Sequence, residues 1–180
     1  MDKWKTLSKK TVLTSKLFEV IESESKLPSG IKKIQQNVYR KSTVCVFPVE
    51  KDSIYLISEY RDLWEERMLH AVAGFVDDGE TSLQTAKREL MEEAGLSANH
   101  WEEIARVKLA ASVVRGIVSL FLAKDLESLP SQKLEDDESI KVIKMSLKEA
   151  SEKVLTGEIS DSATMVGILM VEKLKRQKKI

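Results

Sequence analysis

The sequence predicts a mixed fold of the α/β (α+β) class, a sandwich of helices around a mixed β-sheet. Three observations lead to this prediction. Short apolar runs rich in β-branched residues recur along the chain, capped segments of helical periodicity lie between and after them, and the two kinds of segment do not alternate strictly. The 180 residues suffice for a domain with a core of its own.

Composition narrows the classes of function. Lysine plus arginine and aspartate plus glutamate both number 29, so the basic excess typical of a nucleic-acid-binding domain is missing. No apolar stretch suits a signal peptide or a membrane span, which predicts a cytoplasmic protein without a membrane partner. The single cysteine, Cys45, lies in an apolar run and is expected to be a buried structural thiol.

The first 38 residues form a strand-rich segment. Residues 11–13 and 17–21 look like short strands, and Pro28-Ser29-Gly30 predicts a turn. The segment is rich in lysine and glutamate and has few apolar residues for a core. We therefore expect residues 1–38 to be a small β subdomain that packs on another surface, such as a second subunit.

The main domain, residues 39–180, begins with two strands. Residues 43–49 form a nearly continuous apolar run, as in a strand buried on both faces. A turn at Lys51-Asp52 separates them from a second strand at residues 53–59, so the pair predicts a hairpin. Residues 62–73 show a less regular pattern.

The clearest helix covers residues 81–94. Thr81 or Ser82 can cap its first turn, and Gly95 stands where a left-handed residue would end it. An apolar stripe at helical spacing predicts the face that packs on the core, namely Leu83, Ala86, Leu90 and Ala94.

A strand, a loop and another strand follow. Residues 113–123 are apolar and β-branched, which predicts a strand. Residues 124–139 are polar and acidic and are expected to be a loop. Residues 140–145 predict a short strand.

Two helices complete the chain. Ser146 with Glu149 forms a capping box that begins the first, and Gly157 ends it. Asp161 or Ser160 caps the second. The apolar face of this last helix is predicted to include Met165, Ile168, Leu169 and Val171.

Three glutamates share one face of the helix at residues 81–94. Glu89, Glu92 and Glu93 have the spacing i, i+3 and i+4, which places their carboxylates side by side and opposite the apolar stripe. Their repulsion raises pKa values and destabilises a helix, so a compensating partner is expected. Clustered carboxylates suit Mg²⁺ or Mn²⁺. A solvated row of charge is the alternative, but the neighbouring Arg88, which can bind a carboxylate bidentately, favours a metal site.

Residues 74–96 resemble the catalytic box of the Nudix family. That box is written G-x5-E-x7-R-E-U-x-E-E-x-G-U, where U is an aliphatic residue. Every fixed position is filled here, by Gly74, Glu80, Arg88-Glu89-Leu90, Glu92-Glu93 and Gly95-Leu96. The resemblance implies the Nudix-type αβα sandwich and a hydrolase that cuts the pyrophosphate bond of a nucleoside diphosphate linked to another moiety.

The resemblance also implies a role for each position of the box. Glu89 and Glu93 correspond to the principal metal ligands, Glu92 to a further ligand or bridging group, and Arg88 to a residue that orients the glutamates. The implied cofactor is Mg²⁺, with Mn²⁺ as a substitute, and a backbone carbonyl at the position of Ala73 also binds metal in relatives. The structural positions of the box are Gly74, Glu80 and Gly95.

Segments outside the box resemble the ADP-ribose pyrophosphatase, or nucleoside-diphosphate-sugar hydrolase, branch. Glu59-Tyr60-Arg61 is similar to the end of a strand in that branch, and Arg61 is the candidate there for binding the nucleotide-sugar substrate. Residues 135–138 are similar to an acidic loop that supplies a base or a further metal ligand, and Glu138 is the candidate. Residues 1–38 are similar to a small antiparallel subdomain that is exchanged across a homodimer.

Two segments depart from that branch. His70-Ala71-Val72 stands where the branch has Glu-x-Pro, and His70 either lines the site or is a hydrogen-bonded, non-catalytic histidine. Residues 110–116 contain neither the proline nor the acid of the loop that helps to hold the terminal ribose. Arg115 in this loop is a candidate for contacting a phosphate or a sugar hydroxyl. The alternatives that stay open are a dinucleotide polyphosphate or damaged nucleotide as substrate, and a non-catalytic nucleotide sensor.

Overall fold

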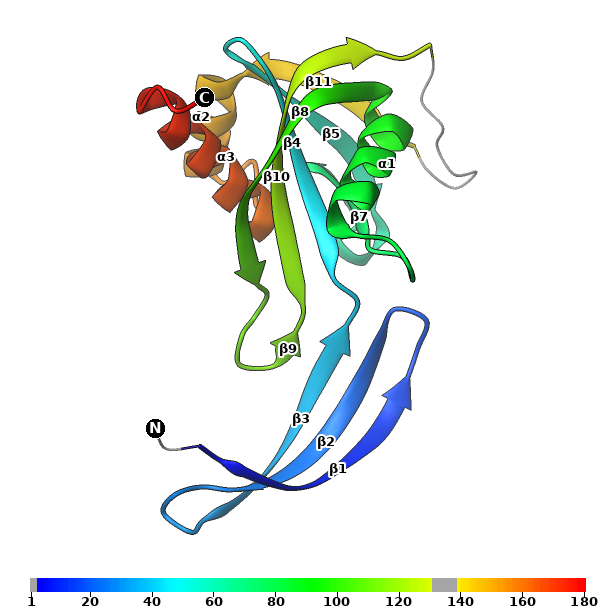
Figure 1. Cartoon of the computed structure of the whole chain (residues 1–180), viewed down its shortest axis with the longest axis vertical. Coiled ribbons are helices and arrows are strands. Elements are labelled where there is room, and N and C mark those ends of the chain that lie inside the picture. The colour runs from blue at the N-terminus through cyan, green and yellow to red at the C-terminus, as the bar shows by residue number, and fades with distance from the viewer. Residues whose placement is uncertain (1–2, 131–138) are drawn as a thin grey trace. The chain divides into compact units, whose positions relative to one another are not determined.

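The computed structural model describes residues 3–130 and 139–180 and divides into two compact units (Figure 1). The first unit falls within residues 1–42 and 108–117, and the second within residues 43–107 and 118–180. The first unit therefore includes a distant loop, residues 108–117, in addition to the N-terminal segment.

The first unit is a four-stranded sheet in the order β1-β2-β3-β9. Strands β1 (Lys5–Thr14), β2 (Phe18–Lys26) and β3 (Lys32–Arg40) pair antiparallel, and β9 (Val114–Arg115) adds to β3 in parallel. The two strands and the turn predicted before residue 38 are confirmed, since Gly30 N donates to Leu27 O between β2 and β3.

The second unit is built on a seven-stranded mixed sheet with the central order β11-β5-β4-β10-β8. Strands β4 and β10 are parallel, whereas β5 pairs antiparallel with β4, β6 and β11, and β7 pairs antiparallel with β4. The strands of this sheet are β4 (Thr43–Glu50), β5 (Ser53–Arg61), β6 (Glu66–His70), β7 (Val72–Phe75), β8 (Leu96–Lys108), β10 (Ile117–Ser128) and β11 (Lys141–Ser146).

Strands β4 and β5 form the predicted hairpin and then diverge. They pair next to their turn, at Val49–Ile54 and Glu50–Ser53. Farther from the turn, β7 pairs with β4 and β6 pairs with β5, so the segment β6–β7 fills the opening between them. The prediction of an irregular segment at residues 62–73 was therefore wrong beyond the short 3₁₀ helix η1 (Asp62–Trp64). Charged residues in β6, such as Arg67, interrupt the alternation of apolar and polar residues that would have indicated a strand.

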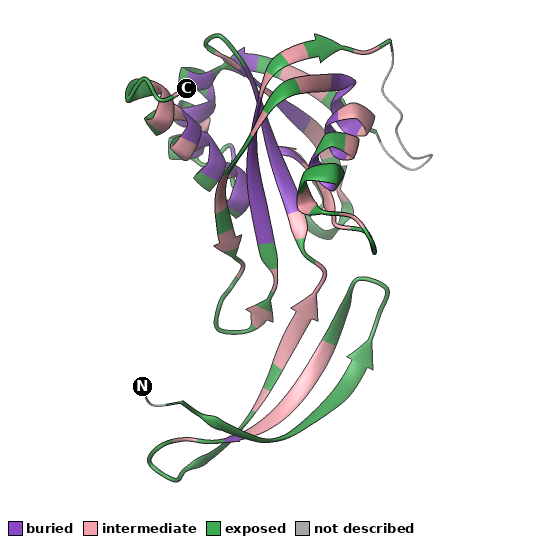
Figure 2. Ribbon diagram, viewed as in Figure 1, coloured by how far each residue is buried: buried purple, intermediate pink, exposed green. Residues whose placement is uncertain are grey.

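Helices cover both faces of this sheet (Figure 1). Helix α1 (Ser82–Ala94) lies on one face, and α2 (Leu147–Thr156) and α3 (Ser162–Arg176) lie on the other. Val44 and Val46 of β4 pack in the core with α1. Phe47 points to the opposite face and packs on Gly167 of α3, where a β-carbon would lie 1.8 Å from the ring. The predicted α/β sandwich with a mixed sheet is confirmed, and its buried residues lie along the central strands and the inner helix faces (Figure 2).

The predicted helix ends are confirmed at both termini of α1 and α2 and at the start of α3. The capping side chains accept hydrogen bonds from backbone amides three residues later, and glycines in the left-handed region end α1 and α2. These residues are Thr81, Ser146 and Asp161 for the caps and Gly95 and Gly157 for the ends.

Other predictions need correction. Leu169 is exposed on α3 although it was expected on the apolar face, whereas Ile168 and Val171 are buried. Residues 124–128 continue β10 instead of forming a loop, and Gly116 interrupts the strand predicted at residues 113–123. Among the described residues, no helix is long and apolar enough to span a membrane.

Candidate active site

The face of α1 that packs on the sheet carries acidic as well as apolar side chains. Ala86 and Leu90 are buried in the core, but Glu89 and Glu93 are also buried, with 9% and 5% of their surface exposed. The predicted separation of an apolar face from an opposite carboxylate face was therefore wrong, and Leu83, which was expected in the core, is exposed. Burial of two of the three glutamates also argues against a simple solvated row of charge.

Strand β7 supplies the surface on which these glutamates pack. Ala73 N donates to Glu93 Oε2 at 2.9 Å. A β-carbon on Gly74 would lie 1.7 Å from Glu89 Oε1, so the carboxylate can approach the strand this closely only because the residue is glycine. Gly74 is itself fixed in the sheet by pairing with Val44 of β4.

Arg88 donates hydrogen bonds to three carboxylates, and its Nη2 also lies 3.6 Å from the carboxylate of Asp77. Its Nε and Nη2 donate to the two oxygens of Glu80, each at 3.2 Å, in a bidentate contact. Its Nη1 donates to Glu89 Oε1 at 2.8 Å and to Glu92 Oε2 at 3.0 Å, and Nη2 reaches Phe75 O at 3.4 Å. The guanidinium is thus the compensating positive charge that the crowded carboxylates require.

These contacts shift the pKa values of Arg88 and Glu80. Burial disfavours the charge of Arg88, but its carboxylate partners, led by Glu80, outweigh that effect and raise the pKa of the guanidinium. The hydrogen bonds from Arg88 and then from the Thr85 hydroxyl, at 2.7 Å, lower the pKa of Glu80. Thr85 had not been singled out in the sequence, because a threonine inside a helix carries no signal of such a contact.

A second polar cluster lies on the same face of the sheet as α1. Ile57 of β5 packs in the core with α1, so strand alternation places Glu59 and Arg61 on that face. His70 pairs with Ile57 across the ladder and therefore shares the face. Arg61 Nη2 lies 2.9 Å from Glu59 Oε2 and 3.3 Å from His70 Nε2. The side chain of Arg61 is partly exposed, which suits the predicted contact with an anionic substrate.

His70 is a buried histidine with partners at both ring nitrogens. Nδ1 lies 2.9 Å from Ala71 O, and because a carbonyl oxygen only accepts, Nδ1 carries a proton. Nε2 lies 3.3 Å from Glu59 Oε2. The close approach of His70, followed by the charges of Arg61 and Arg67, lowers the pKa of Glu59 despite burial. Of the two interpretations of His70, the structure favours the hydrogen-bonded, non-catalytic one.

Two further residues predicted for the site are Arg115 and Glu138. Arg115 belongs to β9 of the first unit, where its guanidinium carbon lies 5.3 Å from the centre of the Tyr39 ring. Glu138 and the rest of the acidic segment 135–138 lie outside the residues that the structure describes. Both assignments stay predictions.

The donor chemistry at α1 fits a hard divalent cation. The carboxylates of Glu89, Glu92 and Glu93 and the backbone carbonyls of β7 are the kind of oxygen ligands that Mg²⁺ accepts. Within residues 3–130 and 139–180, no three acidic, histidine or cysteine side chains have converged at the spacing of a metal centre. Glu89 and Glu92 instead share Nη1 of Arg88.

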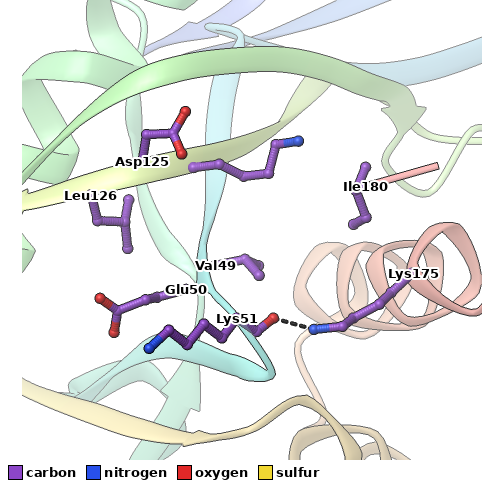
Figure 3. A pocket seen from close by; sticks show the side chains of 8 residues that line it. Val49, Glu50, Lys51, Asp125, Leu126, Lys175 and Ile180 are labelled. Atoms are coloured by element: carbon purple, nitrogen blue, oxygen red, sulfur yellow. Dashed lines mark hydrogen bonds between the residues drawn. The ribbon is translucent and has the colours of Figure 1, made fainter. Parts of the chain in front are cut away.

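A hollow of about 480 Å³ lies at the other end of β4 (Figure 3). It is lined by the β4–β5 turn, β10 and the C-terminal residues, and Lys175 donates to Lys51 O at its edge. Since Gly74 pairs with Val44 and the hollow begins at Val49, the hollow is separate from the carboxylate cluster.

The NUDIX domain family matches residues 39–164, which include the whole carboxylate cluster of α1 and β7. The chain belongs to the Nudix family. It is an enzyme of the pyrophosphohydrolase class, and its resemblance to the ADP-ribose pyrophosphatase branch is confirmed.

Two named relatives and one solved structure are similar to this Nudix chain. It is 28% identical over 166 residues to the ADP-ribose pyrophosphatase of Bacillus subtilis, covering 91% of this chain and 90% of the relative. It is 29% identical over 133 residues to a GDP-mannose pyrophosphatase of Cronobacter sakazakii, covering 69% of each. A crystal structure of an ADP compounds hydrolase superposes with a TM-score of 0.86 at 24% identity, covering 99% of this chain and 97% of that one, and this confirms the fold.

We expect the contact between Glu80 and Arg88 to make the stability of the Nudix unit depend on pH. Because the folded chain lowers the pKa of Glu80 from its ordinary 4.5, the stabilisation is present above that value and is lost as the pH falls through the lower folded value. Urea denaturation between about pH 6 and pH 3 should show a smaller loss of unfolding free energy in Glu80→Gln than in the wild type. Equal losses in the two proteins would contradict this prediction.

Proposed function

We propose that the chain is a Mg²⁺-dependent, cytoplasmic hydrolase of nucleoside-diphosphate sugars, with ADP-ribose or a related sugar nucleotide as substrate. Its products are a nucleoside monophosphate and a sugar phosphate. The observation that carries the proposal is the anchoring of Glu89 and Glu93 against β7 while Arg88 holds Glu89 beside Glu92. A relative that matches along nearly the whole chain, in Bacillus subtilis, is named for ADP-ribose, which supports that sugar nucleotide.

The residues of α1 and β7 would bind the metal ion. Glu89, Glu92, Glu93 and the Ala73 carbonyl are the proposed ligands, and Mn²⁺ can replace Mg²⁺ by the same oxygen chemistry. When bound, the metal neutralises the diphosphate, activates water and stabilises the leaving phosphate oxygen. The Ala73 amide keeps Glu93 on the strand, so the ligands are held before substrate arrives.

Arg61 and Arg115 are the proposed substrate-binding residues. Arg61 presents a partly exposed guanidinium on the face of the carboxylates, where Glu59 fixes it at 2.9 Å. A planar guanidinium of this kind binds phosphate oxygens bidentately. Arg115 is proposed by its position in the sequence as a further contact for a phosphate or a sugar hydroxyl, and Glu138 is the proposed general base.

A substrate panel with Mg²⁺ tests the reaction and its specificity. We expect ADP-ribose and GDP-mannose to be cleaved to a nucleoside monophosphate and a sugar phosphate faster than a dinucleotide polyphosphate or ATP, as measured by chromatography. Glu93→Gln should lower kcat by about two to three orders of magnitude, because it removes charge that holds the metal.

Glu152→Gln, on the exposed surface of α2, is the matched control and should leave kcat unchanged. If ATP were the only compound of the panel to be cleaved, the assignment to sugar nucleotides would be wrong. Near-normal kcat in Glu93→Gln would refute the ligand assignment, and a wild type that binds nucleotide without cleaving any would favour the sensor.

We also propose that the first unit joins two copies of the chain in a homodimer. The described strands of this unit form a single layer, and an apolar row crosses all four of them in register, formed by Leu13, Val20, Val38 and Val114. Residues paired across a ladder share one face of a sheet. Leu13 is 48% exposed, and an apolar sheet face ordinarily needs a second layer to cover it. A second copy of the same face would supply that layer.

Light scattering at micromolar concentration should give twice the 20.4 kDa mass of one chain. Leu13→Glu places a charge in the apolar row and should yield a monomer. Thr11→Glu should stay dimeric. The register of β1 shifts between Thr11 and Leu13, so Thr11 pairs with Ile21 and lies on the other face of the sheet. A monomeric wild type would disprove the assembly.

A further inference from the structure

Ala71 is the residue at which the chain crosses from one strand of the sheet to another. Strand β6 ends at His70, which pairs with Ile57 of β5, and β7 begins at Val72, which pairs with Val46 of β4. Ala71 lies between these ladders and is fully buried. Its backbone N–H and C=O need partners from outside the ladders, because a buried polar group without one is costly.

Two buried side chains supply those partners. Ala71 N donates to Thr164 Oγ1 at 3.0 Å, and Ala71 O accepts from His70 Nδ1 at 2.9 Å. Thr164 lies in the first turn of α3 and is 1% exposed. Helix α3 covers the face of the sheet opposite α1 (Figure 1). Its amide donates to the capping carboxylate of Asp161 at 2.7 Å, so the helix start fixes the residue that binds Ala71.

The same segment reaches the carboxylate cluster two residues later. Ala73 N binds Glu93 Oε2, and Gly74 is the residue on which Glu89 packs without room for a β-carbon. Peptide planarity and the β4 ladder leave little freedom between Ala71 and Ala73. A displacement at the crossing would therefore change the position of both glutamates.

We propose that Thr164 is a positioning residue for the active site: it fixes the crossing at Ala71 and thereby places residues 73–74 against the carboxylates of α1. The inference rests on the proposed metal-dependent function. Thr164 acts through the backbone and from the other side of the sheet, so its effect should be on the geometry of the metal ligands.

The affinity for Mn²⁺ alone, measured by electron paramagnetic resonance without substrate, tests that geometry, because displaced ligands bind the ion more weakly. Thr164→Val keeps the shape but removes the acceptor of Ala71 N–H, and we expect Mn²⁺ affinity and kcat both to fall about tenfold, as for outer partners of metal ligands. KM for the sugar nucleotide should change less than kcat. Thr164→Ser restores the acceptor and should bind Mn²⁺ like the wild type.

Ile168→Val, one turn later on the same helix, is the control for a loss of stability without loss of the hydrogen bond. It should bind Mn²⁺ like the wild type. If Thr164→Val fails to fold by circular dichroism, Thr164→Ala, which leaves room for water, replaces it and should also bind Mn²⁺ more weakly. Unchanged Mn²⁺ affinity in the folded variant, or an equal loss in Ile168→Val, would overturn the inference. A wild type that binds no Mn²⁺ would overturn the proposed function itself.

Discussion

The carboxylates of Glu89 and Glu93 are buried against strand β7. Their negative charge is stabilised there by Arg88 and by the β7 backbone. Removing an ion from water costs several kcal/mol unless charge-assisted hydrogen bonds replace its hydration. Arg88 provides such bonds to three glutamates, and Gly74 gives Glu89 the space to approach. The placement of α1, the identity of residue 74 and the chemistry of the cluster all depend on this arrangement.

The divergence of β4 and β5 creates the position that this arrangement needs. If the two strands paired along their whole length, no segment could enter between them and present Ala73 and Gly74 to α1. The inserted segment crosses at Ala71, where side chains complete the backbone hydrogen bonding. The carboxylates on one face of the sheet are thus linked to α3 on the other face.

The elements with local signals were predictable from the sequence. The caps Thr81 and Asp161 and the terminal glycines were identified because capping depends on residues close in sequence. The match to the Nudix box identified the three glutamates and Arg88 by their positions in the motif. The bidentate contact of Glu80 with Arg88, eight residues apart, was not deduced, because it depends on how the loop before α1 returns to the helix.

Other features depend on tertiary packing and carried no local signal. Leu83 has the spacing of a core residue, yet the buried face of α1 is turned toward Glu89 and Glu93, since the strand under the helix binds them. The charged β6 is a strand because it fills a gap in the sheet, which its own sequence does not indicate. The buried hydroxyl of Thr164 accepts a hydrogen bond from the backbone amide of Ala71, which is more than ninety residues away in the sequence.

Diffraction from crystals soaked with Mn²⁺, recorded for its anomalous signal, tests the central claim most directly, namely that the glutamates of α1 are the metal ligands. We predict a peak at the carboxylates of Glu89 and Glu93 and the carbonyl of Ala73, with oxygen distances of about 2.0–2.3 Å. A peak elsewhere, while both glutamates keep their contacts with Arg88 and β7, would contradict the account.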